Sequence, residues 1–211
     1  MNIAQFTFNP FQENTYVVWD ESGECVVIDA GNYTQKEGSV LFGFIKDKGL
    51  KPVYALNTHG HVDHILGVVE VTKEYGIPFA LNGEDSFLVD TAPSHGALYG
   101  FDVKEVPVVG KDLNGLGEIS FGSTTLTIIH TPGHTPGHVC FYDPASRVMF
   151  TGDTLFKASI GRTYLPGCDY GRISKRIIDR ILPQCGQVTI STGPGPTSTT
   201  GIATNCNPFL L

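Results

Sequence analysis

The sequence has few cysteines, and their spacing excludes the common cysteine-based sites. The five cysteines are odd in number, widely scattered and never arranged as C-x-x-C (Cys25, Cys140, Cys168, Cys185 and Cys206). Disulfide frameworks usually carry an even number of cysteines, and cysteine-based zinc sites usually carry C-x-x-C pairs. We therefore expect reduced thiols that take part in neither kind of site.

Long apolar runs and a basic leader are also absent. No segment approaches 18 consecutive apolar residues, and residues 1–10 contain no basic stretch followed by an apolar one. A membrane-spanning helix needs about 20 mostly apolar residues, and a signal peptide needs a basic segment before its apolar core. The sequence thus predicts neither export nor membrane association, and we expect a cytoplasmic location.

Basic residues are fewer than acidic residues. The chain has 14 Lys and Arg against 21 Asp and Glu, which gives a formal net charge of −7 and a pI near 5.4. Nucleic-acid binding needs a basic surface, so we expect a small-molecule substrate and no nucleic-acid partner, and the oligomeric state stays open. A local basic group could still bind a small anion or lie on a solvated surface (Lys157, Arg162, Arg172, Lys175 and Arg176).

Apolar patterning is sufficient for one domain spanning residues 1–211, in which 41% of the residues are hydrophobic. Strands are predicted at 3–8, 15–19, 25–28, 52–57 and 78–81, and again at 103–109, 119–121, 124–129, 139–142 and 148–151. Helices are predicted around 40–45, at 63–75 and at 173–182. Two β-rich halves with helices outside them predict an α+β fold, a four-layer αββα sandwich.

The segment 58–64, Thr-His-Gly-His-Val-Asp-His, concentrates metal-binding groups. Three of the seven histidines and Asp63 lie within six residues. Side chains two residues apart on a helix point about 200° apart, so His59 and His61 can converge only from a loop or a strand. The predicted strand at 52–57 ends just before this segment. We expect a metal-binding loop at the strand's carboxyl end, the alternative being a set of surface histidines.

Two further strand ends carry metal-binding residue types. His134 lies between two Pro-Gly turns after the strand at 124–129, and Asp153 follows the strand at 148–151. Asp153 alone could equally be a turn residue or a helix cap. Its appearance beside two histidine loops favours a ligand role, and its two oxygens could bridge two cations.

Residues 82–100 are expected to form a weak helix and a loop that overhangs a pocket. His95 in this stretch is either a substrate contact or a surface residue.

The motifs THGHVDH, TPGHTPGH, GDTLF and Gly161-Arg162-Thr163 resemble the metallo-β-lactamase-fold hydrolases, most closely the glyoxalase II-like (hydroxyacylglutathione hydrolase-like) branch. The resemblance implies an αββα sandwich with a dinuclear metal site. It implies that the first metal is held by His59, His61 and His134, the second by Asp63 and His64, and that Asp153 bridges them. The expected cofactor is Zn²⁺, as one or two ions, with Fe or Mn as alternatives.

The chain departs from this family at three positions. The family has a last histidine ligand in a G-H-G-P turn, where this chain reads Gly193-Pro194-Gly195-Pro196, and proline has no side-chain ligand atom. Tyr164 and Cys168 replace an aspartate and a glycine of the family pattern. The second metal position should therefore be weakened, unless His138 substitutes, although its place at a strand start could turn it away.

The resemblance implies hydrolysis of a thioester or ester by metal-activated hydroxide, with Asp63 orienting the water as the catalytic residue. Glutathione-specific members carry a C-terminal helical domain that we do not expect here, so glutathione specificity is not predicted. One alternative is a persulfide dioxygenase with a single iron on His59, His134 and Asp153. The other is an inactive metal-binding homologue, suggested by Pro194 and Tyr164.

Overall fold

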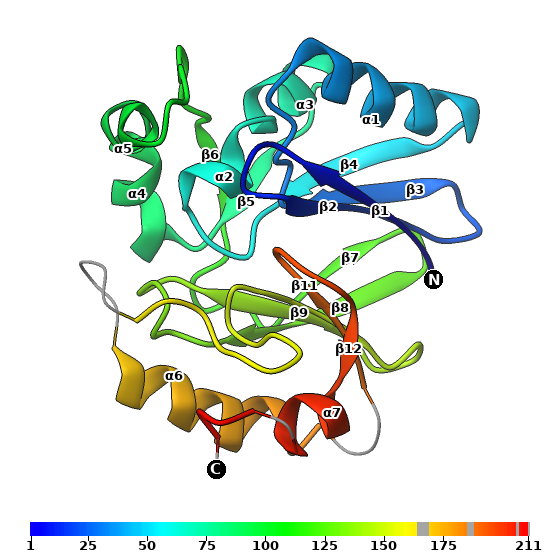
Figure 1. Ribbon diagram of the computed structural model, residues 1–211. Coiled ribbons are helices and arrows are strands. Elements are labelled where there is room, and N and C mark those ends of the chain that lie inside the picture. Colours follow the sequence, from blue (N-terminus) through cyan, green and yellow to red (C-terminus); the bar gives the residue numbers. More distant parts are fainter. Residues whose placement is uncertain (164–168, 185–187, 206, 211) are drawn as a thin grey trace.

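The computed structural model describes residues 1–163, 169–184, 188–205 and 207–210, which form two six-stranded sheets. The sheets lie face to face, with helices on their outer surfaces (Figure 1). The strand orders are β1-β2-β3-β4-β5-β6 and β12-β11-β10-β9-β8-β7, so each half of the chain builds one sheet. The predicted αββα sandwich is confirmed.

The first sheet starts as an antiparallel meander and continues as parallel strands. Its strands are β1 (Asn2–Phe8), β2 (Glu13–Trp19), β3 (Glu24–Ile28), β4 (Lys51–Leu56), β5 (Phe79–Leu81) and β6 (Val109–Asp112). Helices α1 (Gln35–Asp47) and α3 (Val68–Tyr75) cover its outer face (Figure 1). Helix α1 begins with a capping box, in which Thr34 and Glu37 satisfy each other's backbone amides.

The second sheet is mostly antiparallel, with one parallel pair between β10 and β11. Its strands are β7 (Glu118–Phe121), β8 (Thr124–His130), β9 (Val139–Asp143), β10 (Val148–Gly152), β11 (Thr189–Thr192) and β12 (Ser198–Thr199). Its outer face is covered by α6 (Tyr170–Arg176), a π-helical turn η2 (Ile177–Ile181) and α7 (Thr200–Asn205).

A buried apolar core lies between the sheets. Tyr16 and Ile28 from the first sheet belong to the same cluster as Phe141 and Phe150 from the second. Two more clusters fill the spaces between each sheet and its helices. Because the sheets are held at a fixed separation, loops at their shared edge are brought to a common place. The expectation of one domain over residues 1–211 stays a prediction.

The predicted helix at 63–75 is wrong in one respect, because it is two helices. The chain forms α2 (Val62–Ile65), breaks at Leu66 and Gly67, and resumes as α3. A side chain on Gly67 would collide with the amide of Asn32, so the close approach of these backbones requires glycine. The break lets α2 present its first turn to the histidine loop.

The predicted strand at 103–109 is also wrong, because pairing with β5 begins only at Val109. Pro107 in this stretch has no amide to donate to a strand partner. The weak helix expected within 82–100 forms three short pieces: η1 (Gly83–Asp85), α4 (Ser86–Asp90) and α5 (Ala92–Leu98). The helix predicted at 173–182 starts earlier, at Tyr170, because the Asp169 side chain caps it.

No helix in the described part of the chain is both long enough and apolar enough to cross a membrane.

Candidate metal centre

Three histidines from two loops converge at one edge of the sandwich. His59 and His61 follow β4, and His134 lies between β8 and β9. Nδ1 of His61 lies 3.0 Å from Nε2 of His59 and 2.9 Å from Nε2 of His134. His59 is fully buried, and His134 is 2% exposed. The structure thus brings together the three residues that the sequence placed around a first metal.

Hydrogen bonds set the tautomer of His59. The Thr58 hydroxyl donates to Asp29 Oδ2 at 2.8 Å, so it can accept a proton from His59 Nδ1 at 3.1 Å. Nε2 of His59 then carries a lone pair that points toward His61. Burial, followed by the charge of His64, holds the pKa of His59 well below its usual range, so the ring is neutral and able to bind a cation.

His134 is oriented in the same way. Its Nδ1 donates to the carbonyl oxygen of Arg162 at 2.9 Å, which leaves a lone pair on Nε2. Nδ1 of His61 therefore faces the lone pairs of two imidazoles, although it can donate at most one proton. A cation between the three nitrogens would satisfy all of them, so this cluster fits a metal ion.

Carboxylates gather around His64 to form a second cluster. Nε2 of His64 lies 3.1 Å from Oε2 of Glu13, 3.5 Å from Oδ1 of Asp153 and 3.9 Å from Oδ2 of Asp63. Burial lowers the pKa of His64, but Glu13 and Asp29 outweigh it and raise the pKa well above its usual range. In the absence of a metal, a protonated His64 would be the positive charge among these carboxylates.

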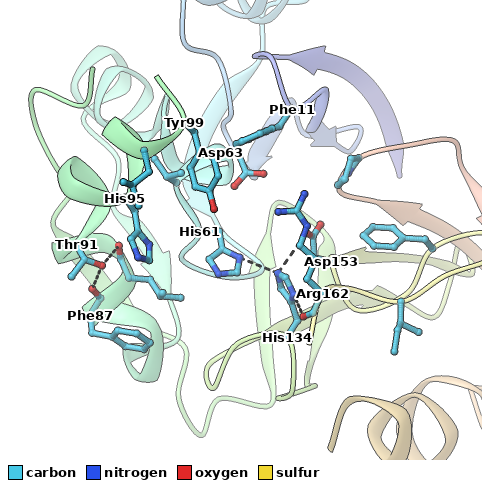
Figure 2. Close-up of a pocket in the computed structure, with 16 residues that line it drawn as sticks. Phe11, His61, Asp63, Phe87, Thr91, His95, Tyr99, His134, Asp153 and Arg162 are labelled. Atoms are coloured by element: carbon cyan, nitrogen blue, oxygen red, sulfur yellow. Dashed lines mark hydrogen bonds and ion pairs between the residues drawn. The ribbon is translucent and has the colours of Figure 1, made fainter. Parts of the chain in front are cut away.

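Asp153 lies between the two clusters. Its Oδ1 lies 3.5 Å from Nε2 of His64. Its Oδ2 lies 3.5 Å from Nε2 of His134 (Figure 2). Burial raises its pKa, but the hydrogen bond and charge of His64 lower it below its usual range, so the carboxylate is ionised. One ionised oxygen is therefore directed toward each cluster, which is the arrangement that a bridging ligand needs.

Asp29 contacts Nδ1 of His64 and so orients its ring. Its Oδ2 lies 3.2 Å from Nδ1 of His64, and its two oxygens accept hydrogen bonds from the amide and hydroxyl of Thr58 at 2.8 Å. Asp29 adopts a φ of 52°, a conformation that non-glycine residues rarely take and that often marks functional sites. The carboxylate leaves Nε2 of His64 directed toward Asp63 and Asp153.

A cavity of about 620 Å³ opens above the clusters, and His61, Asp63, His134 and Asp153 line it (Figure 2). Much of its wall is apolar, from Phe11, Phe87, Leu98, Tyr99, Phe156 and Ile160. Helices α4 and α5 supply part of the wall, which confirms that residues 82–100 overhang a pocket. His95 also lines the cavity. Of the five basic residues between positions 157 and 176, Arg162 is the one that lines it.

Three buried acids of the site were missed by the sequence analysis: Glu13, Asp29 and Asp85. Glu13 begins β2 and Asp29 follows β3, and both strands are largely buried. An acid next to a buried strand was the available signal, since such groups are seldom buried without a partner. Asp85 lies in η1 and had no comparable signal.

His138 is buried beside the first cluster without joining it. Its ring stacks on His59 with centroids 5.0 Å apart, and Nδ1 lies within 3.1 Å of the hydroxyls of Thr131 and Thr154. It belongs to none of the candidate ligand groups found among the described residues. Cys25 and Cys140 are buried free thiols, whereas Tyr164, Cys168, Cys185 and Cys206 lie outside the described residues.

Comparison with known proteins identifies the family of the chain. The family model of the metallo-beta-lactamase superfamily matches residues 8–198. Hydroxyacylglutathione hydrolase GloC of Haemophilus influenzae is 32% identical over 212 residues, which cover 100% of this chain and 98% of that protein.

Two crystal structures are similar over nearly their full length. The BLEG-1 B3 metallo-beta-lactamase has a TM-score of 0.90 and 34% identity, covering 99% of both chains. TTHA1623 in a di-iron-bound form has a TM-score of 0.88 and 33% identity, covering 98% of this chain and 100% of that one. The present chain belongs to the metallo-beta-lactamase superfamily, whose members are generally metal-dependent hydrolases.

Proposed function

We propose that the protein hydrolyses a thioester or ester with metal ions held at the two clusters. His59, His61 and His134 would hold one ion, Asp63 and His64 would take part in holding a second, and Asp153 would contact both. The observation that carries the proposal is the convergence of three imidazole nitrogens beside the cavity. Nδ1 of His61 lies 3.0 Å from Nε2 of His59 and 2.9 Å from Nε2 of His134, and His61 and His134 line the cavity. Nδ1 of His61 can donate its proton to only one of the other two nitrogens.

A bound metal would supply a water molecule of lowered pKa and would polarise the substrate carbonyl. Asp63 is placed to orient that water, because it lines the cavity and its side chain is 19% exposed. Without a metal, burial raises the pKa of Asp63, and a cation beside it would lower that pKa again and keep the carboxylate ionised, so that it can accept a hydrogen bond from the water. His134 and Asp153 keep their positions through the contacts described above.

The cavity wall favours a substrate with an apolar part and an anionic group. Phe11, Phe87 and Tyr99 provide the apolar surface, while His95 and Arg162 are positioned at the same cavity. A thiolate leaving group, whose conjugate acid has a pKa of about 8.5, needs less stabilisation than an alkoxide. Because Pro194 replaces one expected ligand, a thioester is the substrate least affected. The relative named hydroxyacylglutathione hydrolase supports this class.

Zinc is the metal we propose for the first cluster, since tetrahedral histidine sites are typical of Zn²⁺. Iron and manganese also bind imidazole and carboxylate groups, and a similar structure carries two irons.

The test measures metal content and activity on the same purified protein. Protein loaded with Zn²⁺, Mn²⁺ or Fe²⁺ is assayed with a hydroxyacyl thioester of glutathione, an acyl thioester of a smaller thiol and an oxygen ester. Metal-dependent thioester cleavage, abolished in His61→Ala, is expected. Oxygen uptake on a persulfide by protein with one iron would instead support a dioxygenase, and metal binding without turnover would support an inactive homologue.

A further inference from the structure

The loop after β11 reaches the second cluster, although it brings no histidine there. A side chain on Gly193 would lie 3.0 Å from Cε1 of His64 and 3.1 Å from Oε2 of Glu13, and would collide with Asp153. The next residue, Pro194, lines the cavity. The loop therefore packs directly on the cluster, and its proline leaves the second metal position without the expected ligand.

Strand β2 holds this loop in place. The side-chain amide of Asn14 donates hydrogen bonds to the carbonyl oxygens of Gly193 and, at 2.9 Å, Gly195. The Tyr16 hydroxyl donates to the carbonyl oxygen of Thr192 at 2.7 Å. Glu13 is the residue immediately before Asn14, at the start of the strand. The same strand end therefore carries the loop anchor and a carboxylate directed at the cluster.

Glu13 is buried beside His64 but has no hydrogen-bond donor among the described residues. It is 0% exposed, and neither carboxylate oxygen accepts a hydrogen bond from the residues that the structure describes. Its Oε2 lies 3.1 Å from Nε2 of His64, a separation compatible with two ligands on one ion. A buried carboxylate without donors is costly unless a cation stands beside it.

The oxygen atoms around His64 also form a set that a cation could bind. Four carboxylates surround its imidazole: Glu13, Asp29, Asp63 and Asp153. Of these four, Asp29 is already engaged by the amide and hydroxyl of Thr58. The remaining three carboxylates and Nε2 of His64 are the groups left to bind an ion.

We propose that Glu13 takes the place of the missing histidine and completes a second metal site with Asp63, His64 and Asp153. The inference rests on the proposed metal-dependent function. A site with three carboxylates and one imidazole is richer in oxygen than the histidine cluster beside it. Oxygen-rich sites suit harder ions such as Mn²⁺, so the second site should prefer manganese more strongly than the first does.

The test is the metal stoichiometry of Glu13→Gln, measured by dialysis against Mn²⁺ and Zn²⁺ followed by elemental analysis. The wild-type protein should bind about two ions, and the variant should keep the first while its affinity for the second falls at least about 10-fold. Manganese-loaded wild-type protein should show the EPR signal of a coupled pair, which the variant should lose. Glu70→Gln neutralises a glutamate outside both clusters and should bind as the wild type does.

A second variant, which adds back the missing histidine, separates loss of a ligand from loss of the fold. If Glu13 fills the histidine's place, the double variant Glu13→Gln/Pro194→His should regain the second ion and the coupled signal. Undiminished second-ion affinity in Glu13→Gln, or a wild-type protein that binds a single ion, would overturn the proposal. So would a Glu13→Gln protein that fails to fold and is not recovered by Pro194→His. These readouts need no substrate, so two bound ions without thioester cleavage would refute the hydrolase and leave the Glu13 site standing.

Discussion

Asp85 joins the two histidine loops by accepting a hydrogen bond from the Thr135 hydroxyl at 2.6 Å. The same carboxylate accepts hydrogen bonds from the backbone amides of Gly60 at 3.1 Å and Gly137 at 2.7 Å. Gly60 lies between two histidines of the first loop, and Thr135 follows His134 in the second. Asp85 itself is fully buried. One carboxylate thus sets the distance between segments far apart in the sequence.

Replacing Asp85 by alanine should therefore loosen the first metal site without removing a ligand. Buried donors would lose their acceptor, at a cost of about 1–3 kcal/mol each. The variant should bind its first metal about 10- to 100-fold more weakly, as changes behind metal ligands commonly do. Competition with a chelator of known affinity measures the effect. Asp90→Ala, at an exposed aspartate of α4, should leave the affinity unchanged, and equal affinities in both variants would refute the role of Asp85.

His59→Ala should remove the first metal, because it leaves an incomplete set of nitrogen ligands. Elemental analysis of the purified variant provides the measurement. Cys25→Ser should retain full metal content, which separates histidine ligation from thiol ligation. His130→Ala is a matched control, since His130 is exposed and contacts the carbonyl oxygen of Pro136. Full metal in His59→Ala would contradict the whole site.

Metal removal should destabilise the folded protein. A metal that binds only the native state, at a free concentration of 100 times its dissociation constant, adds about 2.7 kcal/mol to the free energy of unfolding. Treatment with a chelator should lower the midpoint of thermal unfolding by several degrees, and added Zn²⁺ or Mn²⁺ should restore it. In His59→Ala the chelator should cause a smaller decrease. An unfolding curve that chelation leaves unchanged would show that the clusters bind no ion.

Outside the site, we expect the hydrogen bonds of the Asp20 carboxylate to stabilise the fold less at acidic pH. Burial raises its pKa, but hydrogen bonds from Ser22 and Ser123 outweigh this and lower it below 3.8. Its stabilisation is therefore present above pH 3.8 and is lost as the pH falls through the lowered pKa. Asp20→Asn should cost about 1.5–3 kcal/mol at pH 7. Urea unfolding of metal-free protein should show this difference shrinking below about pH 4, whereas a pH-independent difference would refute the charge effect.

The sequence by itself determined the sandwich and much of the site. Alternating and continuous apolar runs predicted most strands, because a strand with a buried face must carry such a pattern. Dense histidine spacing in the loop at 58–64 predicted a metal-binding group, since those rings cannot converge from a helix. The unbroken helix at 63–75 was wrong because the contact of Gly67 with Asn32 depends on a neighbour in space. The strand at 103–109 was wrong although the sequence carried a signal against it, since Pro107 has no amide to donate to a strand partner.

Only the tertiary structure decided which acids besides Asp63 and Asp153 accompany the histidines. Glu13, Asp29 and Asp85 are separated from the histidine motifs by long stretches of chain, and their side chains meet the site only because the two sheets and η1 converge at one edge. Spacing along the chain cannot reveal such contacts. The sequence showed that Pro194 lacks a ligand atom, whereas the packing of Gly193 against Glu13 and His64 showed which carboxylate lies at that place.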